Sequence, residues 1–192
     1  MTVQECAIKT RRISHPALIC QDIEATLEFY TSVLGMEPIA WQPNPDDPSF
    51  TSLYLHAGEG TILAFVGPAE PARTVLARGR LGIGSLQHLA LQLDRESFQQ
   101  VERELQARGF PYTGPVDRGF AQVLYVRDPN GITLELTHWL TPLPTGVDQA
   151  LVLKTAHRLR EDEGASGIED RHIQQVLATL YGSNGTSPVS QG

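Results

Sequence analysis

The sequence of 192 residues contains only two cysteines, Cys6 and Cys20, and no long uninterrupted run of apolar residues. Two cysteines are too few for a disulfide framework, so a reducing cytoplasm is the expected compartment. A bilayer-spanning helix needs roughly 18–20 consecutive apolar residues, and no stretch approaches that length. The N-terminus also lacks the apolar segment of a secretory signal. These absences predict a soluble cytoplasmic protein with no membrane partner.

Basic residues are also scarce, with 15 Lys and Arg against 22 Asp and Glu and a net charge of −7. The only local cluster, Lys9, Arg11 and Arg12, belongs to an N-terminal lead-in that we assign to residues 1–11. Because binding a phosphate backbone requires a basic surface, the charge argues against nucleic acid as a partner. Hydrophobic residues make up 41% and charged residues 19%, which is ordinary for a globular protein.

What the chain does contain is an internal repeat. The first copy begins with an apolar stretch around His15 and continues through a helical pattern that ends at Gly35, 20 residues later. The second copy has the same order around His88 and ends at Gly109, 21 residues later. Each copy then continues with three short strand patterns and closes on a strand that begins with glycine. The repeat predicts two modules of one design.

Both copies predict the order strand, helix and three strands, from alternating and helical periodicity. The expected elements are residues 12–21, 22–35, 36–43, 50–57 and 60–66, then 84–93, 94–109, 111–115, 119–127 and 131–138. The predicted fold class is α+β, with two βαβββ modules (12–66 and 84–138) forming a cupped mixed sheet within a domain of residues 12–139. Neither module alone buries enough surface to be stable.

Beyond this domain the pattern becomes helical, which predicts an extension over residues 140–181. Residues 148–160 favour one helix, and Ser166 stands at capping-box spacing from Glu169 before a second. The second helix carries an apolar stripe that needs a partner surface, formed by Ile173, Val176, Leu177 and Leu180. Residues 182–192 are polar and are expected to be disordered.

Two histidines and one carboxylate occupy matching places in the two copies. Because strand side chains alternate, His15 shares a face with Ala17 and His88 shares one with Ala90. Glu135 lies on the corresponding face of the last strand, turned away from the helices. An ionised carboxylate buried without a partner costs several kcal/mol, and a divalent cation removes that cost. The set predicts a metal site with open coordination positions, whereas a core role for the histidines is the alternative.

In register, the first copy has Ala64 where the second has Glu135. Tyr125 stands ten residues before Glu135, and a hairpin between them brings this tyrosine near the site. Arg118 precedes the same strand and could offer a planar fork of donors to an anionic substrate. We therefore place Tyr125 and Arg118 at the substrate pocket, although packing and solvent exposure remain alternatives for them.

The other polar residues of interest have structural explanations. His138 stands an odd number of residues after Glu135, so its side chain is expected on the opposite face of the strand, pointing away from the metal. The strand pattern does not decide which face His56 occupies. His157 and His172 belong to the predicted C-terminal helices and are expected at the surface. Asp128 is expected to serve the turn before the last strand.

Three stretches of the sequence resemble the vicinal oxygen chelate superfamily, which includes glyoxalases, extradiol ring-cleavage dioxygenases and fosfomycin-resistance thiol transferases. The resemblance covers about residues 12–139 and is carried by residues 13–35 (ISHPALICQDIEATLEFYTSVLG), 86–94 and 125–136 (YVRDPNGITLEL). It implies paired modules around a divalent metal that is bound by His15, His88 and Glu135.

Departures from the family patterns narrow the reaction. Glyoxalases usually carry a fourth protein ligand, a glutamate, at the place of Ala64. Fosfomycin transferases have a threonine at the place of Ala17, and their potassium-binding loop has no counterpart here. Extradiol dioxygenases use three ligands on Fe(II) and a tyrosine at the place of Tyr125, as the fosfomycin enzymes also do. Small dioxygenase-like members often have a histidine where this chain has Arg118.

The resemblance implies, as first choice, an extradiol-type dioxygenase that uses Fe(II) to cleave a catechol-like aromatic substrate. Tyr125 would be catalytic, and the substrate-binding residues would be Tyr125, Arg118, Ala17 and Ala90. The alternatives are a Lewis-acid enzyme with Mn, Zn or Ni (a thiol transferase, lyase or epimerase) and a non-catalytic small-molecule-binding protein. A homodimer is expected, and the modules could pair within one chain or between two.

Overall fold

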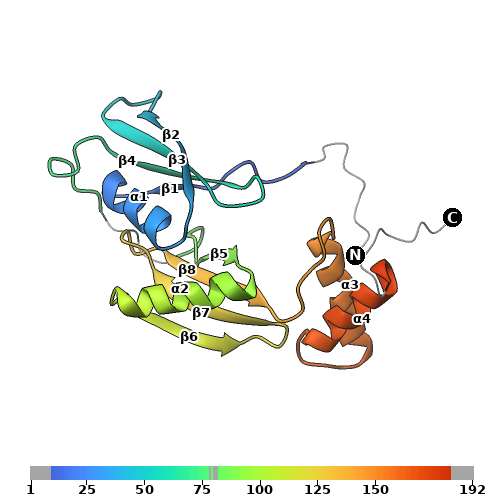
Figure 1. Cartoon of the computed structure of the whole chain (residues 1–192). Coiled ribbons are helices and arrows are strands. Elements are labelled where there is room, and N and C mark those ends of the chain that lie inside the picture. The colour runs from blue at the N-terminus through green and yellow to red at the C-terminus, as the bar shows by residue number, and fades with distance from the viewer. Residues whose placement is uncertain (1–9, 78, 80–81, 183–192) are drawn as a thin grey trace. The chain divides into compact units, whose positions relative to one another are not determined.

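The computed structural model describes residues 10–77, 79 and 82–182 (Figure 1). Most of the predicted lead-in and nearly all of the predicted disordered tail therefore lie outside the described residues. Contacts divide the chain into two compact units. The first comprises Met1–Ser85 together with Asp128–Gly131, and the second comprises Leu86–Arg127 and Ile132–Gly192.

The first unit is a four-stranded mixed sheet with one helix. Its strands lie in the order β1-β4-β3-β2, with β1 parallel to β4 and the other neighbours antiparallel. Its elements are β1 (Ala17–Ile19), α1 (Ile23–Ser32), β2 (Glu37–Pro43), β3 (Phe50–His56) and β4 (Ile62–Pro68).

The second unit repeats this design and adds two helices. The strand order β5-β8-β7-β6 has the same mixed pattern, with β5 parallel to β8. The α+β prediction of two βαβββ modules with C-terminal helices is thereby confirmed. The elements are β5 (Leu89–Gln92), α2 (Arg95–Ala107), β6 (Tyr112–Asp117), β7 (Ala121–Arg127), β8 (Thr133–Trp139), α3 (Gln149–Asp162) and α4 (Asp170–Tyr181).

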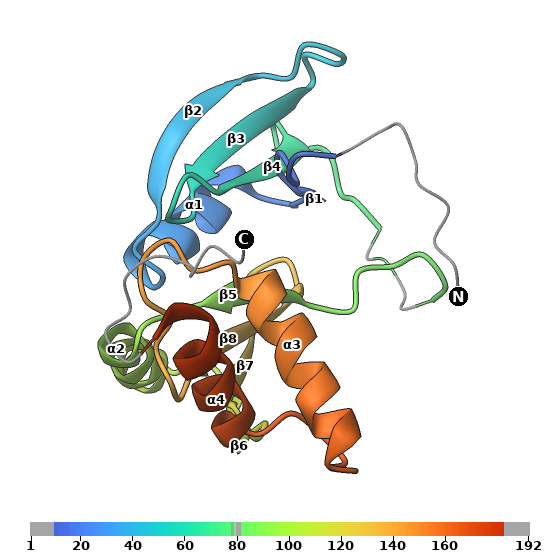
Figure 2. The same cartoon turned by 90° about the vertical axis from the view of Figure 1, so that its right-hand side faces the viewer.

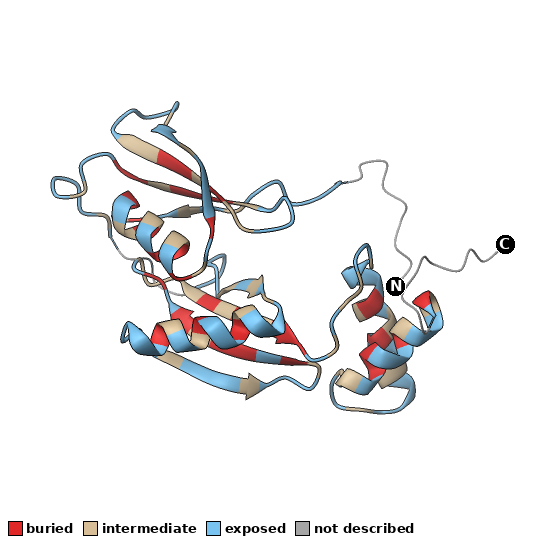
Figure 3. Cartoon of the chain, viewed as in Figure 1, coloured by how far each residue is buried: buried red, intermediate tan, exposed pale blue. Residues whose placement is uncertain are grey.

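Both module helices begin at the predicted aspartates. The Asp22 carboxylate accepts a hydrogen bond from the Ala25 N–H at 3.0 Å, and Asp94 accepts one from Ser97 at 2.7 Å. Each cap satisfies an N–H that the first helical turn leaves without a partner. Figure 3 shows buried residues along the central strands and the inner helix faces, while β2 and β6 at the sheet edges are mostly exposed.

The first strand of each module is shorter than predicted. The first residue of β1, Ala17, pairs with Ala64, which is only two residues from the start of β4. Pro16, directly before β1, has no N–H with which to continue the ladder toward His15. Leu89 pairs with Leu134, one residue into β8, so the chain before it has no strand to pair with. Both candidate histidines therefore lie in the residues directly before a strand.

The 128–131 turn packs on α1 within the first unit. The buried Tyr30 hydroxyl donates to Asp128 at 3.2 Å, and the Asn130 amide donates to the Thr26 hydroxyl at 3.1 Å. The Asn130 side chain also accepts the Gln21 N–H at 3.0 Å. Asp128 serves its turn as predicted, by accepting the Asn130 N–H, and in addition fixes the turn to the helix.

The C-terminal helices run side by side and pack on the second module (Figure 2). The helix predicted from Ser166 instead starts at Asp170, with Glu169 as its cap, and His172 accepts the Glu169 N–H. His172 is fully buried, so its prediction as a surface residue was wrong. The reason is this capping contact, together with Glu163 at 3.1 Å from the second ring nitrogen. No helix among the described residues has the length and apolarity to cross a membrane.

Candidate metal centre

The two modules place an alanine and a glutamate at equivalent points of their sheets. Ala17 pairs with Ala64 across the parallel β1–β4 ladder, and Ala90 pairs with Glu135 across β5–β8. The predicted register between Ala64 and Glu135 is confirmed. Ala17 and Ala90 are both exposed, in agreement with a face that the helices do not cover.

In the second unit four predicted site residues come together. His88 Nε2 lies 3.6 Å from Glu135 Oε2. The Tyr125 hydroxyl donates to the same carboxylate oxygen at 2.5 Å. Arg118 Nη2 donates to the Tyr125 hydroxyl at 3.0 Å, with the guanidinium carbon 5.8 Å from the ring centre. Two hydrogen bonds in series thus lead from the exposed Arg118 to the partly buried carboxylate.

The hydrogen bond between Arg118 and Tyr125 has a consequence for charge. It raises the pKa of Arg118 above its usual value, with a further contribution from the electrostatic interaction with the same tyrosine. The guanidinium therefore stays protonated and cannot act as a base. Its role is confined to donating hydrogen bonds and positive charge.

The orientation of His88 suits a metal ligand. Its Nδ1 faces the side-chain carbonyl oxygen of Gln87, which can only accept at that contact. Nε2 is the ring nitrogen that faces Glu135. This arrangement, with the outer nitrogen fixed by a second group, is the usual one for metal-bound histidine.

The spacing of these donors also suits a divalent ion. Two donors that are each about 2.0–2.2 Å from a metal lie about 2.8–3.6 Å apart when the angle between them is about 90–110°. The 3.6 Å between His88 Nε2 and Glu135 Oε2 is at the upper end of that range. One nitrogen and one carboxylate oxygen are ligands that Fe, Mn, Zn and Ni all accept.

The first unit contains a counterpart of this arrangement. His15 is exposed and lies edge-on to Tyr54, with ring centres 5.9 Å apart; His88 and Tyr125 are 6.5 Å apart in the same orientation. Tyr54 pairs with Ala64 across β3–β4 as Tyr125 pairs with Glu135 across β7–β8. His15 Nδ1 contacts the Ser14 hydroxyl at 3.2 Å.

Sequence reasoning missed Tyr54, although a signal was present. Tyr54 stands ten residues before Ala64, as Tyr125 does before Glu135. Among the described residues, no three His, Cys, Asp or Glu side chains form a cluster that could hold a metal ion. In the second unit the structure brings together His88, Glu135, Tyr125 and Arg118. In the first unit it places His15 beside Tyr54.

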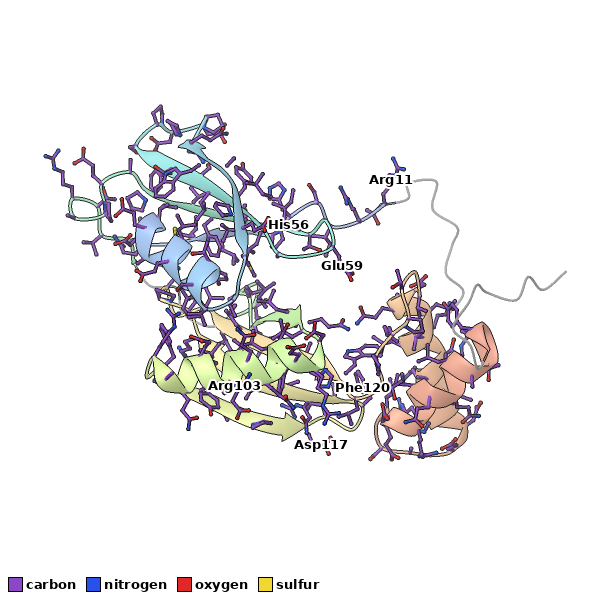
Figure 4. All side chains as sticks on the ribbon, in the orientation of Figure 1. Arg11, His56, Glu59, Arg103, Asp117 and Phe120 are labelled. Atoms are coloured by element: carbon purple, nitrogen blue, oxygen red, sulfur yellow. The ribbon has the colours of Figure 1, made fainter. Side chains whose placement is uncertain are left out.

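The remaining histidines lie outside this arrangement. His138 is buried with its ring 5.8 Å from Phe98 of α2, on the helix side of the sheet as predicted. His56 accepts the Gly60 N–H at 3.3 Å in the β3–β4 turn, where Figure 4 shows it near Glu59. His157 is exposed on α3, as predicted.

Comparisons with known proteins agree with these features. The sequence profile of the Glyoxalase/Bleomycin resistance protein/Dioxygenase superfamily matches residues 12–136. The Bacillus subtilis protein named "Putative ring-cleaving dioxygenase MhqA" is 35% identical over 115 residues, which cover 59% of this chain and 35% of MhqA. The chain thus spans about a third of the length of that relative.

A lactoylglutathione lyase of Salmonella typhimurium is 30% identical over 135 residues, which cover 65% of this chain and 90% of the lyase. A glyoxalase/dioxygenase structure from Nostoc punctiforme aligns with a TM-score of 0.56 at 22% identity, over 72% of this chain and all of that one. The last likeness is one of fold. With its repeated modules and its matched profile, the chain belongs to the Glyoxalase/Bleomycin resistance protein/Dioxygenase superfamily.

Proposed function

We propose that the protein is a metal-dependent enzyme that cleaves catechol-like rings as an extradiol-type dioxygenase, with Fe(II) held by His15, His88 and Glu135. The observation that carries the proposal is the pairing of Ala17 with Ala64 where the second module pairs Ala90 with Glu135. With one carboxylate instead of two, the proposed ligand set leaves coordination positions open. The likeness to MhqA supports ring cleavage as the reaction class.

Bound Fe(II) would supply adjacent positions for a catecholate and O2 and the redox chemistry between them. Extradiol cleavage breaks the ring bond between one oxygen-bearing carbon and its unsubstituted neighbour. Each of these two carbons receives one atom of O2, so no other reductant is needed. Tyr125 keeps Glu135 in one orientation by donating its hydroxyl proton to the carboxylate, and its hydroxyl oxygen can still accept a hydrogen bond from a substrate hydroxyl. Arg118 stays charged, and one of its N–H groups donates to Tyr125. The other N–H groups of the guanidinium can donate to a substrate carboxylate or phenolate.

The second candidate is a Lewis-acid enzyme such as a lyase, which would use Mn, Zn or Ni. The observation that favours it is the 30% identity to a lactoylglutathione lyase over 90% of that enzyme's length. Against it stands Ala64, because the resemblance predicts a second glutamate there in glyoxalases. Reaction with a panel of catechols, compared with reaction with a hemithioacetal, separates the two candidates.

The first experiment is metal analysis after anaerobic purification. We expect one divalent ion per site, and loss of most of it in a His88→Ala/Glu135→Ala double variant. A matched control is His157→Ala/Glu161→Ala, which removes a surface histidine–carboxylate pair with a 3.4 Å separation. Full metal content in the first double variant would contradict the proposed ligands.

The second experiment is turnover of catechols by the Fe(II)-loaded protein. Native protein and Arg118→His, which introduces the histidine of dioxygenase-like relatives, are assayed in parallel. Ring opening by either supports the dioxygenase. If both fail with every catechol tested while a Lewis-acid reaction proceeds, the second candidate replaces the first.

A further inference from the structure

The C-terminal helices fasten the turn that carries Arg118. Asp170, the first residue of α4, donates its backbone N–H to the carbonyl oxygen of Gly119 at 3.0 Å. Its Oδ2 accepts a hydrogen bond from the Thr141 hydroxyl at 3.0 Å, two residues beyond the end of β8. A single residue of α4 therefore holds both the β6–β7 turn and the chain that leaves the sheet.

The contact at Gly119 leaves no room for a side chain. Gly119 has φ +84°, and a Cβ on it would lie 2.6 Å from the carbonyl oxygen of Ile168. The turn is also tied internally, because the Gly119 N–H donates to Asp117 at 2.7 Å. The Arg118 N–H donates to the Ala121 carbonyl at 2.8 Å. The backbone of Arg118 is thus fixed by bonds on both sides.

An apolar cluster supports this attachment. Phe120 lies edge-on to Trp139, with ring centres 5.0 Å apart, and packs against the buried residues of the helices. Figure 4 labels Phe120 and Asp117 at the end of the sheet that carries the turn. The cluster's buried members are Ala121, Trp139, Val152, Ala156, Ile173, Val176 and Tyr181.

We propose that α3 and α4 position Arg118 for substrate selection, with Gly119 and Asp170 as the positioning residues. The Arg118 side chain reaches the Tyr125 hydroxyl from a backbone that these contacts hold, so releasing the turn moves the guanidinium fork. The extension then sets the preference for substrates that carry an anionic group. This ligand class rests on the proposed function, whereas the positioning of Arg118 does not.

The test compares Gly119→Ala with Gly146→Ala. Gly146 has φ +81°, and nothing lies within 4 Å of a Cβ there. Both variants therefore place alanine in the same left-handed conformation, and only Gly119→Ala collides with the backbone of the α3–α4 connection. Thr141→Val, which removes one hydrogen bond without a collision, is the second variant if Gly119→Ala does not fold. Thr141→Ser retains the hydroxyl and should restore native behaviour.

The first readout needs no substrate. Amide hydrogen exchange of residues 117–125 is followed by NMR, and we expect faster exchange at Arg118 and Gly119 in Gly119→Ala and Thr141→Val. Gly146→Ala and Thr141→Ser should match the native protein. Equal exchange in Gly119→Ala and Gly146→Ala would overturn the positioning of Arg118 by the helices.

The second readout is selectivity between 3,4-dihydroxybenzoate and catechol with Fe(II)-loaded protein. We expect the ratio of KM for the carboxylate to KM for catechol to rise on the order of tenfold in Gly119→Ala, as for loss of one charge-assisted hydrogen bond, with a smaller change in kcat. In an Arg118→Ala background, Gly119→Ala should add nothing. An unchanged KM ratio despite altered exchange would refute the selectivity role. If the native protein cleaves neither compound, the proposed function fails, and exchange alone decides the positioning.

Discussion

Replacing Tyr125 with phenylalanine tests how Glu135 is held. The hydroxyl donates to the carboxylate at 2.5 Å, and a hydrogen bond to a charged acceptor contributes about 1.5–3 kcal/mol. A tenfold change in an equilibrium constant corresponds to about 1.4 kcal/mol. Loss of this hydrogen bond in Tyr125→Phe is therefore expected to lower the affinity for the metal by roughly ten- to a hundredfold. Loss of a group that orients a metal ligand typically weakens metal binding by about the same 10–100-fold. From sequence alone, Tyr125 is expected to act mainly on the substrate, and this hydrogen bond changes that expectation.

The assay is competition with a chelator of known affinity under anaerobic conditions, with Fe(II) and separately with Mn(II). The matched control is Tyr54→Phe, because Tyr54 holds the same place on β3 but pairs with Ala64, which offers its hydroxyl no carboxylate. We expect Tyr125→Phe to bind metal roughly ten- to a hundredfold more weakly. Tyr54→Phe should bind metal with native affinity.

Two results would refute this reasoning. Native affinity in Tyr125→Phe would show that the hydroxyl does not orient a metal-binding carboxylate. Equal losses in Tyr125→Phe and Tyr54→Phe would show that both tyrosines act by packing against their histidines. Circular dichroism of both variants ensures that a difference in affinity is not a difference in folding.

Three further predictions follow from individual contacts. Protein reconstituted with Ni, Co or Zn should not isomerise the methylglyoxal–glutathione hemithioacetal, because Ala64 supplies no second carboxylate; robust turnover in an absorbance assay would contradict this. Truncation after Trp139 should lower the melting temperature, because it exposes the apolar cluster that α3 and α4 bury; an unchanged melting temperature would make the helices an independent appendage. Burial raises the pKa of the Cys20 thiol to about 11, so little of the reactive thiolate is present at pH 9. Iodoacetamide should therefore alkylate Cys20 much more slowly in the native protein than in urea at this pH, and equal rates would refute the burial.

The repeat is what made the fold predictable from the sequence. Helix caps, periodicity and the alternation of strands are local signals, and they correctly gave both modules and the helices that begin after Asp22 and Asp94. Comparing the two copies also predicted a contact between residues far apart in the sequence. The elements have matching order and spacing in both modules, so Ala64 and Glu135 were expected at equivalent positions of their sheets, as the pairing with Ala17 and Ala90 shows.

The errors arise where distant residues decide local structure. The capping-box spacing at Ser166 is a valid local signal, but the Ile168 carbonyl packs against Gly119, and the helix begins only after Glu169. His172 is buried because its ring caps that helix, which no helical periodicity reveals. The strands around His15 and His88 were predicted too long because strand length depends on the partner strand.

The two tyrosines show how one substitution can change the chemistry of a duplicated design. Tyr54 and Tyr125 occupy equivalent places beside His15 and His88, but only Tyr125 has a carboxylate opposite it. Its hydroxyl donates to Glu135, whereas the residue paired with Tyr54 is an alanine, whose side chain has no acceptor. Alanine at position 64 therefore offers no carboxylate, either as a metal ligand or as an acceptor for the hydroxyl of Tyr54. Under the proposed function, a ligand set with one carboxylate instead of two leaves more coordination positions for the oxygens of a substrate.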